Sequence, residues 1–408
     1  MKVKDLKLIL EKYNLTGEQI KKIERFDEEQ LTNFLKTITS SDITYMDSII
    51  KVIEKRKEIS PEQLELLNNS VTSDVANTFA DFINQTKCSM SDESKLELMN
   101  YVNGIEYTEI GIEAMKIIWQ MAEAGVTRTD EKKHVILGRI MANCSDLEKL
   151  TYIKDFLYTL YPTASFRETI DKEVLDEHNV ESDIISIMTQ CPIEKAPYLF
   201  KVLSGLMHST RINNDNYDRF INTLDTAANL PSIKKLEIAS NCASLFVVPK
   251  EDRQLDYLNA IMSSESIQGA ECMLRILKKS TNYLNDTIYE TPELLTLIKL
   301  IGSFDGEDIY RLFGNKLRKE INKNNVPAAL YMVKHRDGHS TDYKLTTTVL
   351  SVLEDKENYC LFDELYEEDR EAAIEGLKEL GESFPDMEFT SNKTYVKRIS
   401  NNSNDSEE

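Results

Sequence analysis

Residues 334–342, KHRDGHSTD, hold the side chains most suited to chemistry, since His335, Asp337 and His339 lie within five positions. Two imidazoles and a carboxylate could bind a divalent metal or transfer protons. On one continuous helix, residues four apart share a face, so His335 and His339 would converge. Gly338, however, follows a basic patch and stands where a helix is expected to end. We therefore interpret the stretch as a connection between two helices, and we keep a metal-dependent or acid–base site as the alternative.

Cysteine is the other residue type whose placement suggests a site. Cys144 and Cys191 occupy equivalent turns in two similar segments, which raises the possibility of a zinc site or a disulfide. Neighbouring packed helices lie about 8–10 Å apart, whereas a disulfide needs Cα atoms within about 7 Å. We therefore expect both cysteines to be small buried side chains. The remaining cysteines are scattered and form no CxxC pair: Cys88, Cys242, Cys272 and Cys360.

The known catalytic and nucleotide-binding signatures are missing from the sequence. It contains no GxxxxGK[ST], GxGxxG, HExxH or GxSxG motif. Trp119 lies on an apolar helical stretch and is expected in the core. We accordingly assign no catalytic, cofactor-binding or metal-binding residue and expect the chain not to be an enzyme.

Composition narrows the class of partner. The 408 residues carry 70 acidic and 49 basic side chains, for a net charge of −21. Binding along a nucleic-acid backbone needs a surplus of Lys and Arg, so we do not expect it here. The charge keeps a long surface soluble and could attract a basic protein partner. The sequence begins with a charged amphipathic stretch and has no long apolar run, so we expect a cytoplasmic protein that does not enter the membrane.

Local signals predict helices throughout. Only 13 Gly and 9 Pro occur, too few for a fold rich in tight turns. Thr16 with Gln19 and Ser145 with Glu148 fit the capping box that starts helices, and Ser60 precedes a proline suited to a first helical turn. Apolar residues recur at helical spacing, and we find no alternating β-branched run. The predicted fold class is all-α.

A unit of two helices recurs along the chain. "IMANCSDLEKLTYIKDFL", "IMTQCPIEKAPYLFKVL" and "IMSSESIQGAECMLRIL" each read as a helix end, a short polar turn and a second apolar-striped helix. Looser copies place the steps between successive units at 36, 38, 47, 37, 37 and 39 residues, with anchors at Leu66, Val102, Ile140, Ile187, Leu224, Ile261 and Leu300. This recurrence predicts an α-solenoid of about seven or eight two-helix repeats near 40 residues each.

In repeat length, helix pairing and turn pattern, the chain resembles the HEAT/armadillo class of helical repeats. The resemblance covers roughly residues 60–365 and lacks the regularly placed Pro, Asp and Arg of standard HEAT units. It implies an extended curved surface of the kind that binds proteins or peptides.

We predict the following domain organisation. Residues 1–58 form an N-terminal helical cap, and residues 59–365 form the helical-repeat solenoid, with insertions near 160–180 and 318–345. An acidic capping helix covers residues 366–388, and a disordered polar tail covers 389–408.

The leading functional hypothesis is a non-enzymatic protein–protein interaction or scaffold protein that binds a partner along a curved acidic surface. Three alternatives stay open. The first is an acidic inhibitor or decoy that occupies a nucleic-acid-binding site of a target protein. The second is a structural component of a larger assembly. The third is a metal-dependent enzyme that uses His335, Asp337 and His339. The oligomeric state is left open.

Overall fold

The computed structural model describes residues 12–86, 90–123, 131–160, 170–245, 253–281, 292–305, 387–390 and 395–398. The first helices in chain order are α2 (Gly17–Ile23), α3 (Glu28–Ser40), α4 (Met46–Arg56), α5 (Pro61–Asn68), α6 (Ser73–Asn84), α7 (Asp92–Asn103), α8 (Thr108–Glu123), α9 (Glu131–Ala142) and α10 (Leu147–Leu160). They are followed by α12 (Lys172–Glu177), α13 (Val180–Gln190), a 3-10 turn (Ile193–Lys195), α14 (Ala196–Ser209), α15 (Tyr217–Asn229), α16 (Ile233–Ala243), α17 (Arg253–Met262), α18 (Ile267–Thr281) and α19 (Pro292–Gly302).

Regular structure described between residues 12 and 305 is helical, apart from an isolated bridge between Ile170 and Ile212, so the predicted all-α class is confirmed there. Beyond it, β1 (Met387–Thr390) and β2 (Tyr395–Arg398) pair as an antiparallel hairpin. The hairpin overlaps the segment for which we predicted a disordered tail. Residue types enriched in strands, including Phe389 and Val396, explain the difference. None of the helices in the described ranges is both long and apolar enough to cross a bilayer.

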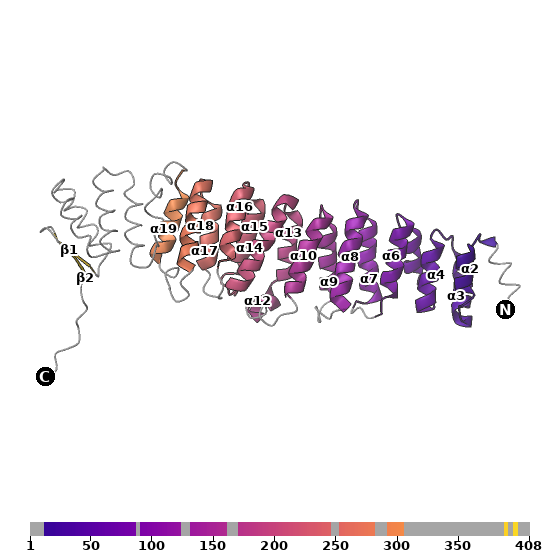
Figure 1. Ribbon diagram of the computed structural model, residues 1–408. Coiled ribbons are helices and arrows are strands. Elements are labelled where there is room, and N and C mark those ends of the chain that lie inside the picture. Colours follow the sequence, from indigo (N-terminus) through magenta and orange to yellow (C-terminus); the bar gives the residue numbers. More distant parts are fainter. Residues whose placement is uncertain are drawn as a thin grey trace, which may run out of the picture. The chain divides into compact units, whose positions relative to one another are not determined.

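The chain divides into two compact units, which are described separately. Unit 1 comprises Met1–Ala164 with Asp176–Ala196, and unit 2 comprises Ser165–Leu175 with Pro197–Glu408. Helices of both units are labelled in Figure 1.

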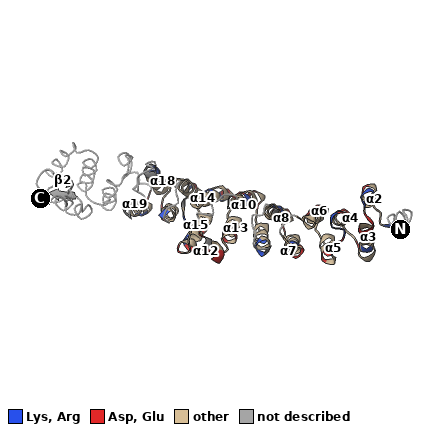
Figure 2. Ribbon diagram, turned by 90° about the horizontal axis from the view of Figure 1, so that it is seen from below, with Lys and Arg blue, Asp and Glu red and all other residues tan. Residues whose placement is uncertain are grey.

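Unit 1 places its helices in two rows. In one row α4 packs on α6, α6 on α8, and α8 on α10; in the other α5 packs on α7, α7 on α9, and α9 on α13. Figure 2 shows α4, α6, α8 and α10 in the first row and α5 and α7 in the second. Contacts between the rows join helices that are close in sequence, such as α8 with α9. Helix α4 lies in the predicted N-terminal cap, yet it packs on α6 and α5 as α7 packs on α9 and α8.

Unit 2 shows the same order of contacts. Helix α15 packs on α17 and α17 on α19, while α16 packs on α18, and α16 and α17 also touch. A glycine marks one close approach in this unit. A Cβ added at Gly205 of α14 would lie 2.6 Å from the carbonyl oxygen of Ala243 in α16, so only glycine fits there without moving backbone.

Capping residues explain where several helices begin. The Thr16 hydroxyl accepts a hydrogen bond from the Gln19 amide, and the Gln19 side chain accepts one from the Thr16 amide, which confirms the predicted capping box. Ser60 and Gln63 make the same reciprocal pair, with Pro61 in the first turn of α5. The prediction for Ser145 is wrong, because the carboxylate of Asp146 accepts from the Glu148 amide at 2.7 Å instead.

Candidate protein-binding groove

Four turns between paired helices share one pattern of burial. A residue within each of these turns is buried, and one to three positions later, where the second helix of the pair begins, a large apolar side chain is exposed. The buried residues are Ser70, Cys144, Leu230 and Ser264. The turn before α14 differs, since Cys191 is buried but no large apolar residue is exposed after it, and the turn before α8 has the exposed residue alone. We call these exposed residues the turn-edge residues: Val71, Tyr107 and Leu147 in unit 1, and Ile233 and Ile267 in unit 2.

The exposure of the turn-edge residues is considerable. Tyr107 is 61% exposed, Val71 54% and Leu147 45%, and the two residues of unit 2 are 39% and 38% exposed. In the part of the chain that the structure describes, the one other large hydrophobic residue with comparable exposure is Ile136. Scattered apolar side chains are normal on protein surfaces, but placement at the same point of successive helix pairs is not scatter.

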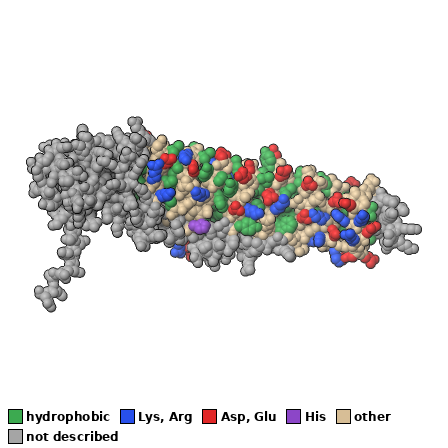
Figure 3. All heavy atoms as spheres, viewed as in Figure 1, with side chains coloured by type: hydrophobic (Ala, Val, Ile, Leu, Met, Phe, Trp, Pro, Cys, Tyr) green, Lys and Arg blue, Asp and Glu red, His purple; other side chains and the backbone are tan. Residues whose placement is uncertain are grey.

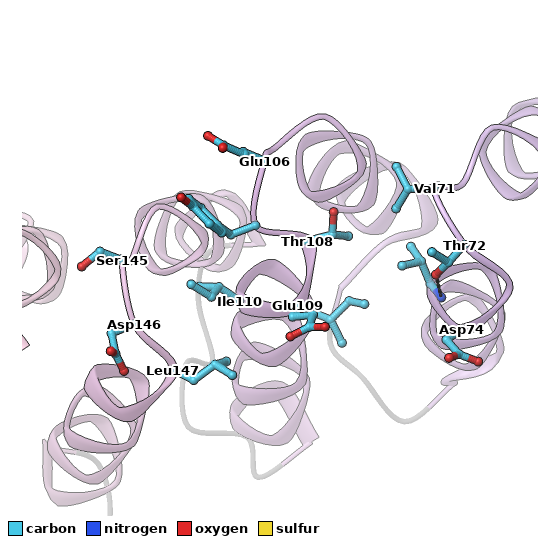
Figure 4. A pocket seen from close by; sticks show the side chains of 13 residues that line it. Val71, Thr72, Asp74, Glu106, Thr108, Glu109, Ile110, Ser145, Asp146 and Leu147 are labelled. Carbon is cyan, nitrogen blue, oxygen red and sulfur yellow. Dashed lines mark hydrogen bonds between the residues drawn. The ribbon is translucent and has the colours of Figure 1, made fainter.

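In unit 1 the three turn-edge residues line one groove of about 770 Å³. Its walls come from the starts of α6, α8 and α10 and the turns before them. Figure 4 shows Val71 on one side, Ile110 near the middle and Leu147 on the other side. Val75 and Ile110 are 5% and 6% exposed and form an apolar floor, while the turn-edge residues form the rim.

Side-chain hydrogen bonds hold the three turns in place. The side-chain amide of Asn103 donates to the backbone carbonyl oxygen of Asn69 at 3.0 Å, which joins the first turn to the second. The side-chain amide of Asn143 donates to the Tyr101 hydroxyl at 2.7 Å, which joins the third turn to α7. Arg139 of α9 lies 5.3 Å from the centre of the Tyr101 ring. The rim is thereby preorganised.

A buried lysine fixes the start of α10 from the other side. Lys149 is 2% exposed, and its ammonium group donates to the carbonyl oxygens of Thr189 at 2.7 Å and Cys191 at 2.8 Å. Those carbonyls lie at the end of α13, where a helix leaves acceptors without intrahelical donors. In unit 2, Lys235 donates in the same way to the carbonyl oxygen of Ser264.

The groove carries negative charge. Four carboxylates line it, and no Lys, Arg or His does: Asp74, Glu106, Glu109 and Asp146. Within the described ranges none of the four forms an ion pair with a basic side chain. Each helix N-terminus supplies about +0.5 charge, so three of them offset about 1.5 charges and leave about −2.5. The surroundings therefore favour a cationic ligand.

The residues that the sequence singled out fall elsewhere. His335, Asp337 and His339 lie outside the described residues, and among those described no group of three His, Cys, Asp or Glu is placed to hold a metal ion. Cys144 and Cys191 are free thiols, 2% and 1% exposed, as expected for small buried side chains. Burial raises the pKa of Cys144 and raises that of Cys191 to about 11. Trp119 is half-buried, with its ring 5.8 Å from that of Phe82.

Sequence reasoning missed the turn-edge residues. Their apolar side chains continue the stripes of the helices that they begin, so periodicity alone places them in the core. Their position relative to the helix distinguishes them from core residues. Each turn-edge residue is the first residue of its helix or lies one or two residues before it.

Comparison with known proteins gives no further assignment. The chain matches no family model, and neither a curated protein nor a solved structure matches it.

Proposed function

We propose that this chain is a non-enzymatic protein–protein interaction protein, and that its helix pairs form an α-solenoid whose turn edge binds a partner. The observation that carries the proposal is the recurrence of an exposed large apolar residue at the start of α6, α8, α10, α16 and α18. Exposed large apolar side chains are costly in water, and a partner that covers them lowers the free energy of the complex.

The contacts within each unit support the solenoid part of the proposal. Apart from α13, which packs on α9 and α10, helices pack on those one or two places away in the order of the chain, which is the nearest-neighbour pattern of repeat proteins. Polar contacts recur at separations close to one repeat, such as Lys201 with Asn241 and Asn259 with Thr223. Such contacts are expected when equivalent positions of successive two-helix repeats lie next to each other.

Charge supports a local acidic site rather than a continuous acidic face. On the face seen in Figure 3, acidic and basic side chains alternate over the described helices. Several acidic and basic side chains of the described helices form ion pairs, such as Arg219 with Asp256 at 3.1 Å and Arg139 with Glu97 at 2.7 Å. We therefore place the negative field that would attract a partner in the groove of unit 1, where none of the carboxylates forms an ion pair with a basic side chain of the described residues.

The test compares two forms of the full chain as bait in affinity capture from an extract of the source cells. One is the wild type, and the other carries Val71→Ser, Tyr107→Ser and Leu147→Ser. These side chains are exposed, so the substitutions should leave the fold intact, which circular dichroism would verify. We expect at least one protein captured by the wild type to be lost, by fivefold or more, with the variant.

A matched control carries Ile136→Ser, which changes an exposed large apolar residue of α9 that is not a turn-edge residue. Proteins that bind through the groove of unit 1 should be retained by this control. Equal capture by the wild type and the triple variant would refute the proposed function of this edge.

A further inference from the structure

We propose that the groove of unit 1 binds an amphipathic α-helix of a partner protein, with apolar residues seven positions apart and Lys or Arg beside them. This inference rests on the proposed function and specifies the partner of that site. It follows from the spacing of the turn-edge residues and from the charge around them.

The spacing selects a helix. Val71, Tyr107 and Leu147 stand at the starts of α6, α8 and α10, and these helices contact one another in that order. Packed helices are separated by about 8–10 Å, so the three residues form a row in which neighbouring side chains are about 10 Å apart. An α-helix rises 1.5 Å per residue and returns to nearly the same face every seven residues, about 10.5 Å along its axis.

A β-strand does not match this row. Its residues on one face recur about every 6.7 Å, so apolar side chains of a strand would meet the first and third of these residues but would miss the middle one, Tyr107. A helix of roughly 15–18 residues would place one apolar side chain against each of the three turn-edge residues, since 14 residues span about 21 Å, the length of the row. Such a segment is long enough to be stabilised by the groove although it would be marginal alone.

The charge selects the residues beside the apolar ones. The carboxylates alternate with the apolar rim: Asp74 follows Val71, Glu106 and Glu109 flank Tyr107, and Asp146 precedes Leu147. An occupant with no cations would bury or crowd these groups without compensation. Lysine or arginine on both flanks of the apolar stripe would pair with them and would also speed association.

The test uses three synthetic peptides labelled for fluorescence anisotropy with the full chain. The first has three leucines seven residues apart in an alanine–lysine background. The second has glutamate in place of each lysine, and the third keeps the composition of the first with its leucines five residues apart. We expect the first to bind the wild type at least tenfold more tightly than either of the others, and more weakly as salt is raised.

A variant with Asp74→Asn, Glu109→Gln and Asp146→Asn removes one carboxylate from each helix start. Asparagine at position 146 keeps a side-chain oxygen that can accept the hydrogen bond from the backbone amide of Glu148. We expect this variant to bind the first peptide at least tenfold more weakly. The matched control carries Glu54→Gln, Glu65→Gln and Glu93→Gln, which remove the same charge from exposed positions outside the groove. It should bind within about twofold of the wild type.

The inference is overturned if the first peptide does not bind, if the re-spaced peptide binds equally, or if both charge variants lose binding alike. The outcome also separates this inference from the proposed function. Loss of a captured protein with the serine variant, together with failure of the first peptide, would retain the docking edge and reject the basic helix as its occupant.

Discussion

Replacing Lys149 by methionine tests how the turn edge of unit 1 is held. The ammonium group is buried and donates to two carbonyl oxygens at the end of α13, those of Thr189 and Cys191. Methionine keeps most of the apolar stem but cannot donate. The substitution therefore leaves both acceptors without this donor.

The expected magnitude follows from three terms. Hydrogen bonds from a charged donor contribute about 1.5–3 kcal/mol each, and a buried acceptor left unpaired costs a similar amount. Removing a buried ammonium group relieves part of its desolvation cost, which opposes that loss. We expect Lys149→Met to lower the free energy of unfolding of unit 1 by about 2–4 kcal/mol.

Hydrogen exchange followed by mass spectrometry measures this effect locally, because α10 and α13 can be compared with helices farther away. Amides at the end of α13 and the start of α10 should exchange faster in the variant, while those of α4 and α6 should not. The control is Lys116→Met, since Lys116 is exposed and, among the described residues, its ion pair is with Glu113 of its own helix at 3.2 Å. Its effect should stay below about 0.5 kcal/mol. Unchanged exchange in Lys149→Met would refute the account of how these turns are fixed.

Three further predictions concern packing and buried thiols. Gly205→Ala should destabilise unit 2 by about 1–3 kcal/mol in urea unfolding, because its Cβ would meet the backbone of Ala243, whereas Gly17→Ala meets nothing within 4 Å and should be neutral or slightly stabilising. In native protein at pH 8, Cys191 should resist N-ethylmaleimide, since burial raises its pKa to about 11 and leaves about one thiol in a thousand ionised; labelling before unfolding would contradict this. Burial also raises the pKa of Cys242 from 9.0 to about 12, so the unfolded chain releases that proton at lower pH than the folded one. The stability of unit 2 should therefore be complete below about pH 9 and should fall as pH rises toward 12, by up to about 1.4 kcal/mol per pH unit from this thiol; a Cys242→Ala variant should show a shallower fall.

The helices and their pairing could be predicted because they depend on short-range signals. Capping residues such as Thr16 and Ser60, and apolar stripes of helical period, act within a few residues of the chain. The order of contacts within each unit also follows from the recurrence of similar segments. These features require no knowledge of the distant surroundings.

The groove could not be predicted, because exposure at a helix start depends on where the neighbouring pair ends. Leu147 and Leu150 are both apolar residues of α10, yet the first is 45% exposed and the second 1%. The partners of Lys149 were equally hidden, since its acceptors lie 40 and 42 residues away. The residue types best suited to chemistry lie outside the described residues: His335, Asp337 and His339. The interpretation of their segment as a connection between two helices therefore stays a prediction.

The most direct test of the central claim is a hydrogen-exchange footprint of the full chain with and without the partner that the wild type captures. Slower exchange in the presence of the partner at residues 69–75, 104–112 and 143–149, with little change in the second helical row, is the result that we predict. Protection confined to other segments would contradict the claim that the turn edge is the binding surface.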